Sequence, residues 1–148
     1  MNGYFQTLKP LSQLVRPWPY PFKGGLSIAN DAEFMSFEYF ETLMAFLNGK
    51  EKTPLGRGLG MNVTSSFFFY STHSYNFSYF SGIKMSGNKQ PYANRLEDYL
   101  RSGWIDTIHA YGDFDGVGGF RREHAQNCYQ VLDEIGALIE VFTNHGSS

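Results

Sequence analysis

The sequence predicts an α/β fold in which strands and helices alternate and the strands form one parallel sheet. Four short apolar or β-forming runs are separated by three stretches with helical periodicity. Each run ends in polar side chains, and in parallel α/β folds such strand ends bind ligands. Alternation of this kind favours right-handed crossovers between parallel strands. Four strands amount to about half of a closed β/α barrel of the TIM-like kind.

The first predicted strand and helix follow an irregular N-terminal segment, residues 1–24. Its prolines remove backbone donors and fix φ; they are Pro10, Pro17, Pro19 and Pro21. The predicted strand covers 26–29 and ends at Asn30 and Asp31. A helix over about 37–47 follows, because apolar residues recur at helical spacing up to an Asn-Gly stop.

The same two periodicities and the glycine positions predict the remaining elements. In chain order these are a glycine turn over 56–60, a strand within 61–70, a long polar and aromatic loop over 74–92, a helix over about 93–102, a strand over 104–108, a glycine-rich loop over 111–119, a helix over about 121–135 and a strand over 138–142. Residues 25–148 therefore form one predicted domain. Because it stops on a strand, we expect a barrel that is incomplete at its C-terminus.

Composition and charge narrow the classes of function. The chain has 148 residues, 42% of them hydrophobic and 18% charged, which is typical of a globular domain. Its net charge of −2 does not indicate the basic surface that binding to nucleic acid requires. The sequence shows neither a signal peptide nor an apolar stretch of the roughly 20 residues that cross a membrane. A cytoplasmic location and secretion as a processed domain both stay open. The single cysteine, Cys128, is expected to be buried and inert.

Aromatic residues make up 18% of the chain and crowd into residues 67–80. They predict a buried strand followed by a packed loop. Alternatively they form a platform on which sugar rings stack through their C–H faces.

Polar and ionisable side chains gather where the predicted strands end. They are Asn30, Asp31, His73, His109, Asp113, Asn144 and His145. Because ligands bind at the carboxyl ends of parallel strands, we expect a shared site there. His124 falls within a predicted helix instead, and we expect it to be exposed.

Histidine and aspartate together suit a divalent metal ion such as zinc. A bound ion would acidify a water molecule and polarise a carbonyl group. His109 and Asp113 are four residues apart and can converge if the chain turns between them. Asp113 could instead cap the glycine-rich turn that follows it.

Three segments in order carry a family resemblance. They are SIANDAE at 27–33, VTSSFFFY at 63–70 and GWIDTIHAYGD at 103–113. Together they resemble the polysaccharide deacetylase (NodB-homology) family of carbohydrate esterases, over about residues 24–146. The resemblance implies a distorted (β/α)7 barrel, of which this chain would be about the N-terminal half. It also implies hydrolysis of acetyl groups on sugars by a metal held by an Asp-His-His set.

Carried onto this chain, the resemblance makes Asp31 and His109 metal ligands, with Asp113 in the place of the second histidine. Asp31 also belongs to the predicted catalytic set. Asn30 stands where the family has its catalytic base, so a base would come from Glu33 or His145. The predicted substrate contacts are Asn30, His73, Tyr111 and Asn144.

The preferred prediction is a metal-dependent hydrolase that deacetylates a carbohydrate. One alternative is a glycoside hydrolase, for which Asp31 and Asp113 would be the two carboxylates. Another is a carbohydrate-binding relative without catalysis, which Asn30 favours. Four parallel strands would leave an open sheet edge, through which we expect self-association or a partner.

Overall fold

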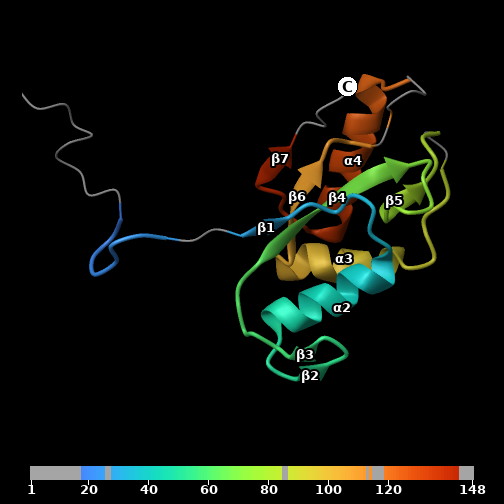
Figure 1. The fold of residues 1–148 in the computed structure, drawn as a ribbon. Helices are drawn as coiled ribbons and strands as arrows, with labels where there is room; N and C mark the ends of the chain where they lie inside the picture. The colour runs from blue at the N-terminus through green and yellow to red at the C-terminus, as the bar shows by residue number, and fades with distance from the viewer. Residues whose placement is uncertain (1–17, 26–27, 85–86, 113, 115–118, 144–148) are drawn as a thin grey trace, which may run out of the picture.

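The computed structural model describes residues 18–25, 28–84, 87–112, 114 and 119–143. Strands and helices alternate along the chain in an α/β fold (Figure 1). The elements are β1 (Ala29–Asn30), α2 (Phe37–Asn48), β2 (Lys52–Thr53), β3 (Gly56–Arg57), β4 (Thr64–Ser71), β5 (Ser78–Ser81), α3 (Ala93–Ser102), β6 (Ile105–His109), α4 (Arg122–Ile135) and β7 (Val141–Thr143). The predicted fold class is confirmed, whereas closure into a barrel stays a prediction.

The main sheet is parallel throughout. Its order is β1-β4-β6-β7, and β5 also pairs with β4. Ser65 pairs with Asn30 on one side and Ile105 on the other. Tyr70 likewise pairs with Phe80 of β5 and bridges to a residue beyond β6. Strands β1 and β5 therefore follow each other along the edge of β4 that faces away from β6.

Two elements differ in kind from the prediction, and the last strand is shifted, since β7 covers Val141–Thr143 rather than 138–142. The loop predicted over 74–92 contains β5, a short strand that pairs in parallel with β4 without an intervening helix. Its polar composition hid the strand, because serines at both ends enclose the buried pair Tyr79 and Phe80. The glycine turn predicted over 56–60 is a small antiparallel hairpin, β2–β3, instead.

The helices begin and end where the sequence predicts. The Ser36 hydroxyl caps α2 by accepting a hydrogen bond from the Tyr39 N–H at 3.2 Å. Gly103 and Gly136 end α3 and α4 in the left-handed conformation, which glycine adopts without a Cβ penalty. Asn48 joins the end of α2 to the chain before β4, since its side chain exchanges two 2.8 Å bonds with the Val63 backbone.

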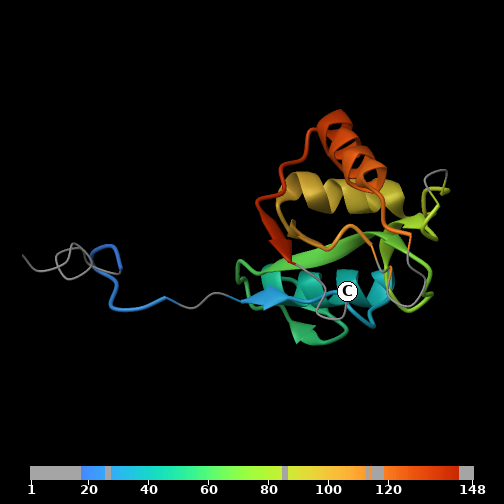
Figure 2. The same ribbon diagram turned by 90° about the horizontal axis from the view of Figure 1, so that it is seen from above.

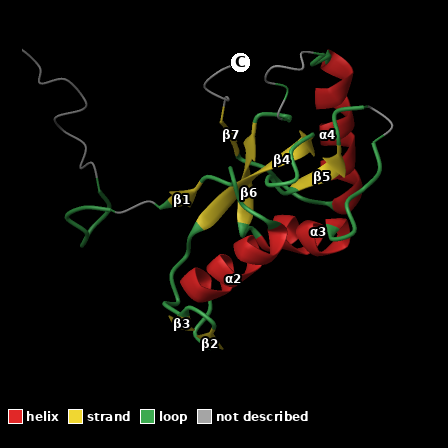
Figure 3. Ribbon diagram, turned by 45° about the vertical axis from the view of Figure 1, so that its right-hand side comes forward, coloured by secondary structure: helices red, strands yellow, loops and turns green. Residues whose placement is uncertain are grey.

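Aromatic side chains form much of the core. Residues 67–70 of β4 are fully buried, as are Phe77 and Tyr79, so the packing interpretation of the aromatic run holds for them. Helices α2 and α3 lie side by side beneath the sheet (Figures 1 and 3), and Phe40 meets Tyr99 edge to face at 5.3 Å. Helix α4 lies next to α3 when the molecule is seen from above (Figure 2). Tyr75 is the exception within the run, because it is exposed.

Cys128 and His124 are among the four buried side chains of α4. Cys128 is buried as predicted, and burial raises the pKa of its thiol, which keeps it protonated and weakly nucleophilic. His124 is also buried, so the prediction that it is exposed was wrong. Its Nδ1 accepts a bond from the Arg121 N–H at 3.0 Å, and its Nε2 lies 2.8 Å from the Ile83 carbonyl oxygen. Its ring therefore caps the first turn of α4, a role that hydrophobic periodicity does not reveal.

We expect His124→Ala to lower the free energy of unfolding by about 2–4 kcal/mol, because a buried ring would leave a cavity and two partly buried backbone groups would lose their partner. Urea denaturation of both proteins measures the difference. Gln126→Ala, on the exposed side of the same helix, is the matched control and should change stability by less than about 0.5 kcal/mol. An equal, small effect of both substitutions would contradict the capping role.

Strand β7 lies at the edge of the described sheet and is exposed along its length. Val141 and Phe142 are about half exposed there. These features agree with an open sheet edge, and self-association through it stays a prediction. None of the helices in the described part of the chain is both long and apolar enough to span a membrane.

Candidate functional site

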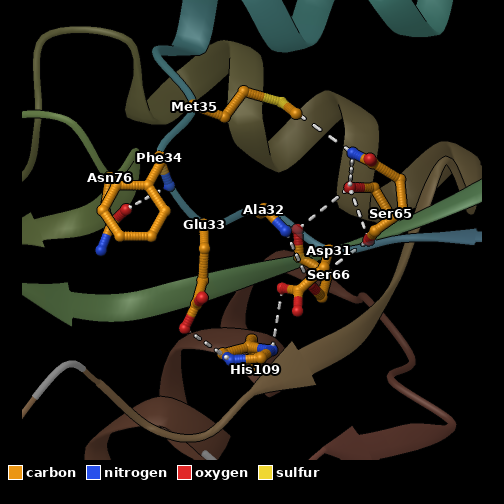
Figure 4. A network of polar contacts seen from close by, with 10 residues as sticks. Asp31, Ala32, Glu33, Phe34, Met35, Ser65, Ser66, Asn76 and His109 are labelled. Atoms are coloured by element: carbon orange, nitrogen blue, oxygen red, sulfur yellow. Dashed lines mark hydrogen bonds and ion pairs between the residues drawn. The ribbon is translucent and has the colours of Figure 1, made fainter.

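Two strand ends bring the first candidate residues together. Strand β1 ends at Asn30 and leads directly to Asp31, while β6 ends at His109. Both strands flank β4 in parallel, so their carboxyl ends meet at the same edge of the sheet. Asp31 Oδ1 lies 3.1 Å from His109 Nδ1 (Figure 4). The sequence placed these two residues in one site, and the structure brings them into contact.

A second carboxylate lies on the other side of the same imidazole. Glu33 Oε1 is 3.4 Å from His109 Nε2, so each ring nitrogen faces one carboxylate (Figure 4). The His109 side chain is only 7% exposed, against 61% for Asp31 and 32% for Glu33. A buried imidazole is thus held between two acidic groups that solvent or a ligand can reach.

Serine hydroxyls of β4 hold the chain around Asp31. Ser66 Oγ accepts the Ala32 N–H at 3.2 Å and lies 3.4 Å from Asp31 Oδ1. The His109 ring also rests edge-on against Phe68, with 4.9 Å between ring centroids. These contacts limit rotation of both partners, which is the preorganisation that a reactive site needs.

Strained backbone directly follows two of these residues. Among the described residues, Phe34 (φ 54°) and Ala110 (φ 48°) are the non-glycine positions with positive φ. Phe34 comes after Glu33, and Ala110 comes after His109. Each such residue costs of order 1–3 kcal/mol, and strain of this kind concentrates at functional sites. The strain thus marks the same site as the contacts.

A small cavity of about 160 Å³ opens at this site. Its lining comes from four strands of the sheet and the residue after β1, namely Asn30, Asp31, Ser66, Thr107, His109 and Thr143. The first and last strands of the sheet order contribute to one cavity, so the sheet curves around it. Pockets for drug-sized ligands span roughly 300–1,000 Å³. This one therefore admits a small group or a single ring rather than a drug-sized ligand.

Asn30 lines the cavity, where the resemblance would place a catalytic base. Its Nδ2 donates to Ser65 Oγ at 3.1 Å and also lies 3.9 Å from the sulfur of Met35. The amide is thus tied to the neighbouring strand. An asparagine amide does not accept a proton at neutral pH, so any base must come from another residue, and Glu33 is the described acid closest to this role.

The geometry of Asp31 and His109 fits a shared cation. Two ligands on one tetrahedral zinc ion, with bonds of about 2.0–2.1 Å, lie about 3.3 Å from each other. The observed 3.1 Å separation is close to that value. Glu33 would then act as the outer carboxylate that accepts Nε2–H and orients the imidazole.

The third predicted ligand, Asp113, lies outside the described residues. Within the part of the chain that is described, no group of three His, Cys, Asp or Glu side chains is arranged to hold a metal ion. The metal site therefore stays a prediction, with Asp31 and His109 in contact and Asp113 not described. The predicted residues Asn144 and His145 also fall outside the described ranges.

Two other predicted contacts lie away from the cavity lining. His73 follows β4 and stacks on Tyr75 at 4.8 Å. Tyr111 packs on Phe120 and faces Tyr129, whose hydroxyl is 3.3 Å from its own. Burial and the Tyr129 hydroxyl raise the pKa of Tyr111 to about 12, so it stays a neutral phenol.

Sequence reasoning missed the hydroxyl residues of the cavity, Ser66, Thr107 and Thr143. All three lie within strands, whereas the strand-end rule points to residues that follow strands. One signal was available, since small hydroxyl residues at the start of an apolar strand leave room for a cavity.

No family model, no curated protein and no solved structure matches this chain. What the site can do therefore follows from the contacts of Asp31, Glu33 and His109 and from the cavity beside them.

Proposed function

We propose that this chain is a hydrolase that removes a small acyl group, such as acetyl, from a carbohydrate. The observation that carries the proposal is the 3.1 Å approach of Asp31 to His109 beside a small cavity at the strand ends. A cavity of about 160 Å³ suits an acyl group. The carbohydrate itself comes from the sequence resemblance to the deacetylase family and is part of the proposal.

We propose that Asp31 and His109 bind a divalent cation such as zinc, with Asp113 as the candidate third ligand. When bound, such an ion acidifies water and polarises a carbonyl oxygen. His109 presents Nδ1 on the side of Asp31, and Glu33 on the opposite side keeps the ring in that orientation. The carboxylate of Asp31 adds negative charge that attracts the cation.

The residues of the chain also provide for proton transfer. Glu33 is partly exposed and lies 3.4 Å from His109 Nε2, on the opposite side of the ring from Asp31. Thr143 lines the same cavity as Asp31, and its hydroxyl is of the kind that can bind a small polar ligand. With a cation beside Asp31, Glu33 therefore orients the imidazole, and it is the proposed base in place of Asn30 for a water molecule on its own side of the ring.

A second candidate is a glycoside hydrolase that uses no metal. Two carboxylates, Asp31 and Glu33, flank one imidazole, and glycoside hydrolysis needs an acid and a base or nucleophile of this type. It differs from the first in the bond that is broken and in its insensitivity to chelators.

One assay series distinguishes the two. Purified protein is incubated with N- and O-acetylated sugar oligomers and with aryl glycosides, once loaded with zinc and once treated with a chelator. We expect acetate release by the zinc-loaded protein, a fall of at least about 10²-fold on chelation, and recovery when zinc returns. Release of sugar from the aryl glycosides at the same rate with and without the chelator would support the glycoside hydrolase. Release of neither product under any condition would contradict both.

A further inference from the structure

Three aromatic rings form a stack on the loops next to the site. Phe34 and Tyr75 lie nearly parallel, 5.1 Å apart and at 16°, and His73 continues the stack beyond Tyr75 at 4.8 Å and 17°. Phe34 is 77% exposed and Tyr75 is 45% exposed. We refer to Phe34, Tyr75 and His73 as the aromatic platform. Large rings this exposed contribute little to the core, so packing does not explain them.

Hydrogen bonds hold Phe34 of the platform in an unfavourable backbone conformation. Phe34 has a φ of 54°, a region that bulky residues avoid because the Cβ crowds the following carbonyl. Its N–H donates to the buried Asn76 side chain at 2.8 Å, and the Phe77 N–H donates to the Met35 carbonyl at 3.1 Å. Two bonds thus tie the loop after β1 to the loop after β4 and fix the ring outward.

The platform adjoins the catalytic candidate directly. Phe34 is the next residue after Glu33, and Figure 4 shows Glu33 between the Phe34 ring and His109. The cavity lies on the Asp31 side of His109 and Phe34 follows Glu33 on the other side, so a sugar oligomer would have to extend across Glu33 to contact both.

We propose that the aromatic platform binds a neutral sugar ring and so positions the carbohydrate whose acyl group enters the cavity. Aromatic faces offer large contact area to the C–H faces of sugars at little entropic cost. The carboxylates of Asp31 and Glu33 disfavour phosphorylated ligands such as nucleotides, since like charges repel. The cavity can hold at most one ring, so the further rings of a sugar oligomer need a surface outside it. This inference rests on the proposed function for its ligand class.

Binding is measured without turnover, on chelator-treated protein, by titration calorimetry with an N-acetylglucosamine tetramer and, separately, with a cellulose tetramer. Phe34→Ala is expected to weaken binding of the acetylated tetramer by roughly 10-fold, as expected for loss of one stacking contact. Tyr75→Ala should also weaken it, because Tyr75 supports the Phe34 ring from behind. Tyr39→Ala removes another exposed aromatic, on α2 and outside the platform, and should leave affinity unchanged.

A stability measurement separates a binding role from a structural one. Phe34→Asn places a residue that tolerates positive φ at this position. Its thermal midpoint should match or exceed that of the unmodified protein, while tetramer binding falls as in Phe34→Ala. A marked fall in the midpoint would instead make Phe34 a structural residue and overturn the proposal.

The outcomes also separate this inference from the proposed function. If no acetate is ever released but both tetramers bind through Phe34 and Tyr75, the platform stands and the hydrolase does not. If acetate is released but Phe34→Ala and Tyr75→Ala leave KM and affinity unchanged, the hydrolase stands and the platform is overturned. Failure of the unmodified protein to bind either tetramer also overturns the platform.

Discussion

His109→Ala protein is expected to lose at least about 10³-fold in kcat/KM for release of acetate from acetylated sugars. The imidazole is the shared partner of Asp31 and Glu33, so its removal separates the cation ligand from the proposed base. Both carboxylates are partly exposed, and water can solvate them once the ring is gone. The fold should therefore survive, and initial rates are measured beside a thermal melt.

Three further variants make this expectation specific. Asp31→Asn removes one charge from an exposed side chain, so its fold should be unaffected. It should lower kcat/KM about as much as His109→Ala does, which tests the site independently of any effect of His109→Ala on folding. Glu33→Gln should cost about 10–100-fold if Glu33 only orients His109, and more if it is the base. Asp133→Asn, at an exposed position of α4, is the matched control. Equal activity in Asp31→Asn and Asp133→Asn would contradict the proposed centre.

Asn30→Asp is expected to raise hydrolysis of acetylated sugars by roughly 10²–10⁴-fold, or to make it detectable for the first time. The new carboxylate would line the cavity where the resembling family keeps its base. The local structure permits the change, because the Ser65 hydroxyl that now lies 3.1 Å from Asn30 Nδ2 can turn and donate to a carboxylate. Rates on acetylated sugars measure the gain.

Asn62→Asp, at an exposed position before β4, controls for added negative charge and should leave the rate unchanged. If zinc-loaded Asn30→Asp protein shows no gain, and Asp31→Asn has no effect either, the hydrolase proposal gives way to the carbohydrate-binding alternative. The bond between Asn30 and Ser65 would then be a structural contact only.

Much of the fold could be predicted because its elements are local patterns. Helical periodicity placed α2, α3 and α4 close to their observed bounds, and the strand-end rule placed Asp31 beside His109. Strand β5 was not predicted, because pairing with β4 depends on contacts between segments rather than on composition. For the same reason the capping role of His124 was missed, since its partner Ile83 lies 41 residues away.

The candidate site was predicted only in part. Glu33 and Asp31 could be named from sequence, but their positions on opposite sides of one imidazole required coordinates. The positive φ of Phe34 could not be predicted from the sequence, because phenylalanine rarely adopts a left-handed backbone conformation. The aromatic platform could not be predicted either, because its rings come from two loops, after β1 and after β4, that are distant in the sequence.

Calorimetric titration of the metal-free protein with zinc tests the central claim most directly, because it asks whether Asp31 and His109 form one cation site. We predict binding of about one ion per chain, lost in both Asp31→Asn and His109→Ala and retained in Asp133→Asn. Absence of binding to the unmodified protein, or equal affinity in all four proteins, would contradict the account.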